Sequence, residues 1–318
     1  MTIWKQGQFY PDLGKKVVDL PNKVNQGPSD PMIKIDGFHV LPDQDGNFIE
    51  GGEINYNEDE LDAIHTYAIV RMVINLYEEL LGKSIYWSWW KDGKGDPIIV
   101  KIRNNDINAR FIKEQKCIEL DYYGPYGNWT YNCRSVDLIA HETGHAILDS
   151  ILPHLNEGSI ESRGIGEAFC DLTAMFWILS QKDLCKHVIE ETDGDLSKNS
   201  ILTLFGVGYG YKVNNYRELR SAINNVNIRK DQYSPYEYSQ DLIGWVYEIL
   251  TELMYGERHL NFRDTEKLYQ LGNYWKKSIF KIYHNDMNKN MNDFVTELKK
   301  EFRLSGYEIK TSLQKKNF

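Results

Sequence analysis

Residues 137–147 read DLIAHETGHAI, and this stretch decides how the rest of the chain is interpreted. Apolar residues surround its polar centre at helical spacing, and the pattern covers residues 135–153, where a proline that cannot extend a helix ends it. On that helix His141 and His145 lie one turn apart on the same face, with Glu142 beside them. The stretch therefore predicts a buried helix whose two imidazoles can bind one metal ion.

Zinc is the metal that suits this arrangement. Neutral imidazole is a favoured zinc ligand, and a catalytic zinc site keeps one coordination position open for water. The pKa of such a water falls to about 7, and Glu142 is placed to take its proton during attack on a carbonyl. The alternative is a surface helix turn whose two histidines share no ligand. The apolar neighbours disfavour it, because burying unpartnered polar groups costs free energy.

A second segment, GIGEAFCDLTAMFW at residues 164–177, predicts another helix over about residues 166–180. Glu167 and Asp171 are four positions apart on it and share one face. Glu167 would complete a His, His, Glu ligand set, and Asp171 could accept the second ring N–H of a ligand histidine and fix its tautomer. The alternative is a solvated acidic face, which the apolar neighbours of the pair disfavour.

Together these segments resemble the thermolysin-like gluzincin metallopeptidases, in which an HExxH helix is followed by an Asn-Glu-Ala-x-x-Asp segment, here GEAFCD. The resemblance implies that His141, His145 and Glu167 bind one catalytic Zn²⁺. It further implies that Glu142 is the general base and that Asp171 is the partner of a ligand histidine.

The same resemblance implies an α+β fold with two lobes and an active-site cleft between them. The N-terminal lobe, residues 1–152, would hold a β-sheet and helices and end in the HExxH helix. The C-terminal lobe, residues 153–318, would be mainly helical and carry the third ligand. A chain of 318 residues is also long for one hydrophobic core. Local patterns predict further helices at 57–82, 239–255, 265–284 and 290–303, and strands at 97–103 and 117–123.

Two shorter segments resemble substrate-binding parts of the family. INARF at residues 107–111 precedes a predicted strand and resembles the Asn-Ala-aromatic segment, which implies that Asn108 and Ala109 contact an extended peptide through edge-strand pairing. A simple turn before a strand is the alternative. LRSAINN at residues 219–225 resembles a Leu-Arg-Ser segment, which makes Arg220 a candidate for binding the substrate carbonyl. The alternative is a surface arginine.

The chain departs from the family where the tetrahedral oxyanion would be stabilised. Gly158 occupies the place of a tyrosine, and Tyr236 the place of a histidine that is followed three residues later by a serine, here Ser239. A phenol can donate a hydrogen bond to an oxyanion, so Tyr236, and after it Tyr238, are the catalytic candidates. The alternative is that this tyrosine-rich stretch is packing and rim surface.

Composition excludes several classes of protein. Apolar residues make up 42% and charged residues 26%, as in ordinary globular proteins, and the net charge of −9 without a basic stripe argues against nucleic acid as a partner. No leader or membrane-spanning run is visible, so we expect no membrane partner and a protein that is cytoplasmic or exported by a signal-less route. The acidic segment ETDGD at 191–195 is a weak calcium candidate and is more simply a solvated loop.

The four cysteines, Cys117, Cys133, Cys170 and Cys185, are too few for a disulfide scaffold. Ordinary buried thiols are the favoured interpretation, and a bridge between Cys117 and Cys133 is the alternative. The sequence leaves the oligomeric state open.

These observations predict a zinc-dependent metalloendopeptidase that hydrolyses peptide bonds in extended peptide or protein substrates. The missing leader suggests a specialised enzyme with one particular substrate. A zinc aminopeptidase is one alternative, although the Gly-x-Met-Glu-Asn segment that binds a free amino terminus is not found. A catalytically silent zinc-containing binding module is the other, because two expected oxyanion donors are replaced.

Overall fold

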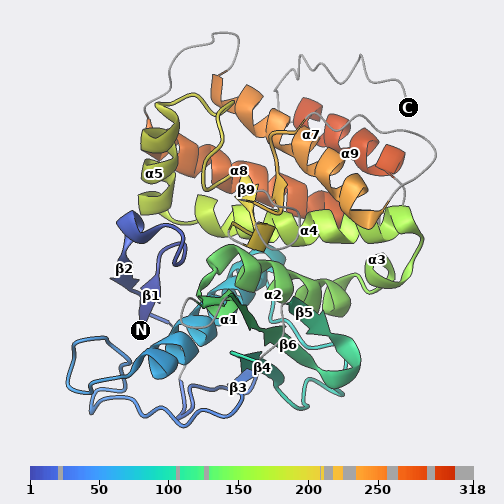
Figure 1. The fold of residues 1–318 in the computed structure, drawn as a ribbon. Helices are drawn as coiled ribbons and strands as arrows, with labels where there is room; N and C mark the ends of the chain where they lie inside the picture. Colours follow the sequence, from blue (N-terminus) through green and yellow to red (C-terminus); the bar gives the residue numbers. More distant parts are fainter. Residues whose placement is uncertain are drawn as a thin grey trace. The chain divides into compact units, whose positions relative to one another are not determined.

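The computed structural model describes residues 1–20, 24–104, 108–124, 129–207, 209–210, 218–224, 234–255, 264–284 and 291–304. The chain forms two compact units: unit 1 comprises Met1–Ile151 and Gly206–Leu219, and unit 2 comprises Leu152–Phe205 and Arg220–Phe318. Helices and small sheets occur in both units, which confirms a mixed α+β fold (Figure 1).

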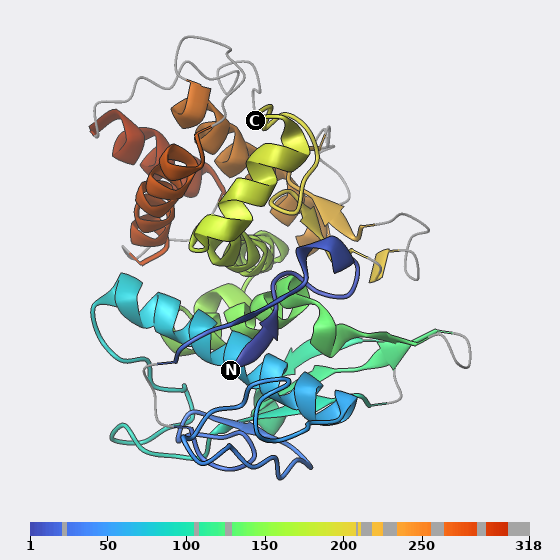
Figure 2. The ribbon, with the colours of Figure 1, turned by 90° about the vertical axis from the view of Figure 1, so that its left-hand side faces the viewer.

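Unit 1 contains a four-stranded sheet with two long helices packed against it. Its elements are β1 (Thr2–Trp4), η1 (Pro11–Leu13), β2 (Lys15–Val17), β3 (Ile33–Ile35), α1 (Glu58–Leu81), β4 (Ile98–Ile102), β5 (Ala109–Ile112), η2 (Lys113–Gln115), β6 (Cys117–Leu120), β7 (Tyr122–Tyr123), β8 (Thr130–Tyr131), η3 (Asn132–Arg134) and α2 (Val136–Ile151). The sheet order is β3-β4-β6-β5; β3, β4 and β6 are parallel, and β5 pairs antiparallel with β6 at the end of the order. Helices α1 and α2 lie together against this sheet (Figure 2).

Helix α1 follows the sequence prediction closely. Asn57 accepts a hydrogen bond from the Glu60 backbone, and the Glu60 carboxylate accepts one from the Asn57 backbone, which completes a capping box. Gly82 ends the helix in the left-handed conformation that glycine adopts without strain. The predicted helix over residues 57–82 is therefore confirmed, with both of its end signals in place.

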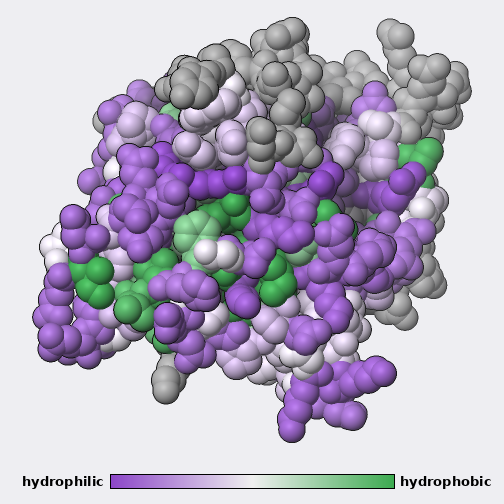
Figure 3. Space-filling model, turned by 60° about the horizontal axis from the view of Figure 1, so that its bottom comes forward, coloured by the Kyte–Doolittle hydropathy of each residue, from purple (hydrophilic) through white to green (hydrophobic). Residues whose placement is uncertain are grey.

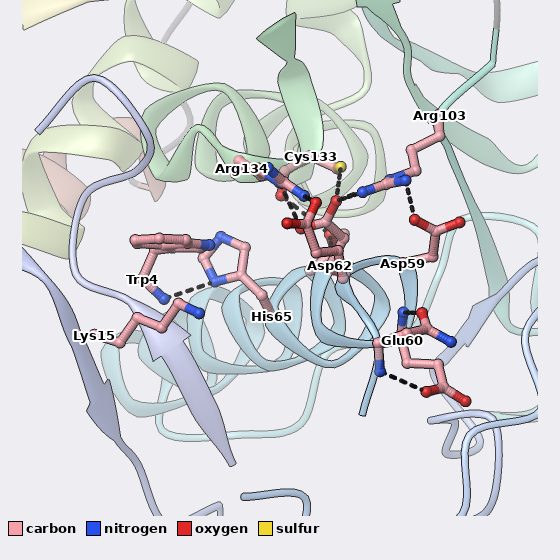
Figure 4. Close-up of polar contacts among 12 residues, drawn as sticks. Trp4, Lys15, Asp59, Glu60, Asp62, His65, Arg103, Cys133 and Arg134 are labelled. Atoms are coloured by element: carbon pink, nitrogen blue, oxygen red, sulfur yellow. Dashed lines mark hydrogen bonds and ion pairs between the residues drawn. The ribbon is translucent and has the colours of Figure 1, made fainter. Parts of the chain in front are cut away.

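A buried carboxylate joins three elements ahead of α2. Asp62 on α1 accepts from Nε and Nη2 of Arg103 at 2.8 and 2.6 Å and from Nε of Arg134 at 2.7 Å (Figure 4). Both guanidinium groups also lie over the ring of Tyr131, at 4.2 and 4.8 Å. Because Arg134 belongs to η3, which leads directly into α2, these ion pairs fix where α2 begins relative to α1.

His65, also on α1, is held in its neutral form. Its Nδ1 accepts a hydrogen bond from the backbone N–H of Trp4 at 3.2 Å (Figure 4). Burial, together with the positive charges of Arg134 and Lys15, lowers the pKa of His65 to about 3. This histidine is a structural link between β1 and α1.

Unit 2 is a group of packed helices with one short strand pair. Its elements are α3 (His154–Glu157), α4 (Ile160–Leu179), α5 (Lys182–Thr192), β9 (Leu204–Phe205), β10 (Arg220–Ser221), α7 (Pro235–Tyr255), α8 (Thr265–His284) and α9 (Met291–Leu304). Helix α4 packs on α7 and α8, and α5 and α9 both pack on α8 (Figure 1). Trp275 anchors this core: its ring meets Phe176 edge to face and its Nε1 donates to the Val246 carbonyl at 3.0 Å.

Helix α4 begins earlier than the sequence predicts. The predicted start was about residue 166, whereas the observed helix starts at Ile160, because the Ser159 hydroxyl caps it by accepting from the Ser162 backbone at 3.1 Å. Helix α5 was not predicted at all. The described parts of α7, α8 and α9 begin and end within a few residues of the predicted ranges.

All four cysteines are buried free thiols, so the favoured interpretation of them is confirmed and the bridge between Cys117 and Cys133 is not formed. No helix among the described residues is long and apolar enough to cross a membrane. The face shown in Figure 3 is mainly hydrophilic, and its hydrophobic side chains form small groups separated by polar ones.

Candidate metal centre

The start of α2 is fixed by a buried acidic residue. Asp137 accepts from the Ser135 hydroxyl at 2.6 Å through Oδ1 and from the Gly206 N–H at 2.7 Å through Oδ2. Burial raises the pKa of Asp137, while the two hydrogen bonds act in the opposite direction. The Ile139 N–H donates to the Ser135 carbonyl, which is the first turn of the helix. Four residues after Asp137 the helix reaches His141.

The two histidines of HETGH converge as their spacing predicts. His141 is 8% exposed and His145 is half-buried, and their Nε2 atoms are 3.2 Å apart. Two imidazole nitrogens bound to one tetrahedral zinc, with each Zn–N bond about 2.0–2.1 Å long, lie about 3.3 Å apart. The observed separation therefore fits a pair of nitrogen ligands that share one zinc ion.

Glu142 is buried next to the edge strand. It is 5% exposed, and its Oε2 accepts from the backbone N–H of Phe111 on β5 at 2.8 Å. This hydrogen bond fixes one carboxylate oxygen and leaves Oε1 as the oxygen that can receive a proton. The predicted base and the predicted substrate strand are thus joined within unit 1.

Asn108 and Ala109 lie where β5 begins. Asn108 is half-buried, and its Oδ1 accepts from the Ala109 N–H at 3.0 Å and from the Tyr209 hydroxyl at 3.3 Å. Its backbone carbonyl accepts from the Asp121 N–H and from Asn132 Nδ2, both at 3.0 Å. The segment is therefore a firmly held start of an edge strand rather than a loose turn.

In unit 2, three residues of ligand type share one face of α4. Glu167, Cys170 and Asp171 follow one another at helical spacing; Glu167 is half-buried, Cys170 is fully buried and Asp171 is 2% exposed. Among the described residues, a group of ligand types that could hold a metal ion consists of His141, His145 and Cys170. This group differs from the predicted ligand set in its third member, a cysteine one turn after Glu167.

Asp171 is the centre of a buried cluster built from three elements of unit 2. Arg220 on β10 binds it with two parallel hydrogen bonds, Nε to Oδ2 at 2.8 Å and Nη2 to Oδ1 at 2.6 Å. The hydroxyl of Ser239 on α7 donates to Oδ2 at 3.3 Å. Arg220 is 8% exposed, so it is not the surface arginine of the alternative interpretation.

The two candidate tyrosines lie in the first turns of α7. Tyr236 is 52% exposed, and the Arg220 guanidinium lies 5.5 Å from the centre of its ring. Tyr238 is half-buried, and burial raises the pKa of its hydroxyl. Its Cβ lies only 2.3 Å from where a Cβ on Gly164 would be, so a glycine is needed there for α7 to pack on α4. Tyr236 is therefore the better placed of the two to reach a bound molecule.

Gly158 leaves no space for the tyrosine that the family has at this point. A Cβ at Gly158 would lie 2.6 Å from the Cβ of Ser162 and 2.8 Å from its hydroxyl oxygen.

In the acidic segment at 191–195, Asp195 accepts from both the N–H and the hydroxyl of Ser197, as in a capped turn. That segment supports the solvated-loop interpretation and gives no support to calcium.

Several contacts of the site escaped the sequence analysis. The Phe111 N–H that holds Glu142 is a backbone group, and the Asp171 and Arg220 pair is 49 positions apart, so no local pattern could reveal either. Tyr209, which binds Asn108, is 101 positions away from it. Cys170 could have been found, because it follows Glu167 by one helical turn in the quoted segment.

No family model and no curated protein matches this chain.

Proposed function

We propose that the protein is a zinc-dependent metalloendopeptidase. The observation that carries the proposal is the His141 and His145 pair, whose Nε2 atoms are 3.2 Å apart on a buried helix that also presents Glu142. The resemblance of HETGH and GEAFCD to the thermolysin-like gluzincins supports the same reaction. We include in the proposal the two-lobed fold of that family, with which the mixed α+β composition is compatible.

His141 and His145 supply two neutral nitrogen ligands. A zinc ion held there would act as a Lewis acid toward the scissile carbonyl and lower the pKa of water. Glu142 takes a proton from the attacking water on Oε1, because its Oε2 is occupied by the Phe111 N–H. Glu142 then gives that proton to the leaving amine, which returns the carboxylate to its starting state.

The third protein ligand is Glu167 in this proposal, and Cys170 is the competitor. A His, His, Glu set is typical of catalytic zinc in peptidases, whereas a thiolate is also a good zinc ligand. Zinc affinity of Glu167→Gln and Cys170→Ser, measured by competition with a chromophoric chelator, separates them. Glu167→Gln is expected to lose affinity and Cys170→Ser to keep it; the reverse result assigns the ligand to Cys170.

The substrate lies extended along β5 and pairs with its backbone. Arg220 and Tyr236 are the proposed donors to the carbonyl oxygen as it gains negative charge, and Tyr238 is the second candidate. Support comes from the cation–π contact between Arg220 and Tyr236, which puts a positive charge and a phenol side by side in unit 2.

The test is a digest of a diverse library of blocked peptides, read by mass spectrometry, with Glu142→Gln as the inactive variant. The exposed Glu114→Gln in unit 1 is the matched control. We expect cleavage by the wild type and the control, and none by Glu142→Gln with zinc retained. Cleavage confined to free amino termini would indicate an aminopeptidase. A zinc-loaded wild type that cleaves nothing would indicate the binding module instead.

A further inference from the structure

The segment between α1 and β4 in unit 1, residues 83–96, reads KSIYWSWWKDGKGD, and we name it the aromatic hairpin. At its tip Lys91 and Lys94 exchange two backbone hydrogen bonds, at 2.9 and 3.0 Å. Between them Asp92 and Gly93 have φ angles of 51° and 71°. An Asp-Gly pair with two positive φ angles is typical of a type I′ turn, which closes a hairpin tightly. The segment therefore has a defined shape.

Two aromatic rings of the hairpin pack on its glycines. A Cβ on Gly95 would lie 2.3 Å from Cδ1 of Trp90, and a Cβ on Gly93 would lie 3.3 Å from Cε1 of Tyr86. The two rings are neighbours, with centroids 6.1 Å apart. Tyr86 is 57% exposed and Trp90 is half-buried. The pair therefore presents aromatic surface to the solvent from a fixed position.

The indole N–H groups of the hairpin are donated within the protein. Trp89 and Trp90 both donate to the Asp96 carbonyl, at 2.9 and 2.7 Å. The buried Trp87 donates to the Met32 carbonyl at 2.9 Å. An indole whose only polar group is already bonded can enter an apolar layer without leaving that group unsatisfied. The same bonds leave these indoles no donor for a sugar hydroxyl, so the hairpin suits a lipid surface better than a polysaccharide.

Ser88 connects the hairpin to α2. Its hydroxyl donates to the buried carboxylate of Asp149, and its N–H donates to the Ser150 hydroxyl at 3.2 Å. The Lys113 ammonium group lies 2.8 Å from the other carboxylate oxygen of Asp149. These contacts hold the rings in place before any ligand arrives, so binding costs little conformational entropy.

The hairpin also carries exposed lysines that have no carboxylate partner among the described residues. They are Lys83, Lys91 and Lys94. The carboxylates of the segment are Asp92, exposed at the tip, and Asp96, which Lys116 binds at 3.0 Å. With Lys116 included, four positive charges stand against two negative ones, in a chain whose net charge is −9. This local excess is the charge complement of an anionic surface.

We propose that the aromatic hairpin binds the surface of a bilayer that contains anionic lipids. Tyr86 and Trp90 enter the headgroup layer, where tyrosine and tryptophan are the favoured side chains, and the lysines bind the charged headgroups. From the sequence we expected no membrane partner, because no run is long enough to span a bilayer; a surface contact needs no such run. The inference is independent of the proposed peptidase activity.

The experiment is sedimentation of the full chain with vesicles of phosphatidylcholine and phosphatidylserine, and with vesicles of phosphatidylcholine alone. The double variant Lys91→Gln with Lys94→Gln removes two positive charges. Asp92→Asn removes the opposing charge at the tip, and asparagine tolerates the positive φ there. Tyr86→Ser removes the exposed ring. The Tm of each variant is measured beside its binding.

Two matched controls lie outside the hairpin. Lys277→Gln removes an exposed lysine of α8 in unit 2. Leu41→Ser removes an apolar side chain of unit 1 that is 54% exposed, close to the value for Tyr86. Both controls are expected to bind vesicles like the wild type.

The wild type is expected to prefer the anionic vesicles by about 25-fold, because each of two net charges contributes about fivefold. The double lysine variant should lose that preference, and high salt should weaken it in the wild type. Asp92→Asn should bind the anionic vesicles about fivefold more tightly, a gain that misfolding cannot mimic. Tyr86→Ser should bind both kinds of vesicle about threefold to tenfold more weakly at either salt concentration.

The inference is overturned if the wild type shows no preference for anionic vesicles, or if the hairpin variants bind them as the two controls do. Unchanged binding of Asp92→Asn would also contradict it, because the charge at the tip would then not face the lipid. Retention on immobilised heparin without binding to vesicles would assign the hairpin to an anionic polysaccharide instead.

Discussion

The histidine pair on α2 and the Asp171 cluster of unit 2 are built in different ways. His141 and His145 come from one turn of one helix, whose geometry places them on the same face, and their Nε2 atoms are 3.2 Å apart. Asp171 lies on α4, but its donors come from β10 and α7, and Arg220 is 49 positions away. The first arrangement survives wherever the helix forms, whereas the second exists only when unit 2 is folded.

This difference predicts where each arrangement is sensitive. Removing a histidine should affect metal binding more than folding, because the contact between the two rings lies within one turn of α2. Removing the Asp171 carboxylate should affect folding itself, because Arg220 is 8% exposed and would keep a buried charge without its counterion.

The largest expected effect is the loss of zinc binding in His145→Ala. Structural zinc sites with four ligands bind with about 10–16 kcal/mol, so removing one ligand should weaken binding about a thousandfold, or about 4 kcal/mol. Chelator competition gives the affinity, and the exposed His284→Ala is the control. Circular dichroism of the metal-free variant should match the wild type. If His145→Ala still bound one equivalent of zinc with unchanged affinity, the histidine pair would not be the metal site.

A smaller effect, about 3 kcal/mol, is expected for the stability of Asp171→Asn. Urea unfolding of the metal-free protein measures it. Asp62→Asn is the matched variant in unit 1, because that buried carboxylate also accepts two hydrogen bonds from one arginine, Arg103. Both should lose stability, but only Asp171→Asn should also weaken zinc binding, since only Asp171 is proposed to orient a ligand. Equal zinc affinity in the two variants would contradict the proposal that Asp171 orients a zinc ligand.

The smallest effect concerns pH and His65. In the unfolded chain this histidine takes up a proton near its ordinary pKa of 6.5, but in the folded protein only near about 3. Between these values the unfolded state binds more protons, so His65 lowers stability as pH falls, by about 1.4 kcal/mol per pH unit. Urea unfolding at pH 7, 6 and 5 should show this slope, and His65→Gln should flatten it. The same slope in both proteins would show that other groups cause the acid sensitivity.

The sequence predicted those parts of the fold that depend on neighbouring residues. The Asn57 and Glu60 capping box and the terminal Gly82 gave α1 correctly, because capping involves residues only three positions apart. The start of α4 was placed six residues late. Ser159 does carry a capping signal, but the polar run ESRG that follows Ile160 shows little apolar periodicity, and the burial of Gly164 depends on α7 packing against it.

The candidate site divides in the same manner. Spacing on α2 and α4 was enough to group His141 with His145, and Glu167 with Asp171. The Phe111 N–H on Glu142 and the Tyr209 hydroxyl on Asn108 were not predictable, because each depends on the register of β5 or on a segment 101 positions distant. Nothing in the local sequence distinguishes these donors from others of their kind.

The sequence by itself determined the HETGH helix and the convergence of its two imidazoles, since both follow from short-range periodicity, and the resemblance of its motifs to a known family implied the mixed α+β class. Only the tertiary structure decided what surrounds the helix. Glu142 is buried against the edge strand β5, and Asp171 is bound by Arg220 and Ser239. The segment Gly206–Leu219 belongs to unit 1 and supplies hydrogen-bond donors to Asp137 and Asn108. The physical reason is that hydrogen bonds between distant segments form only after core packing has brought their backbones together.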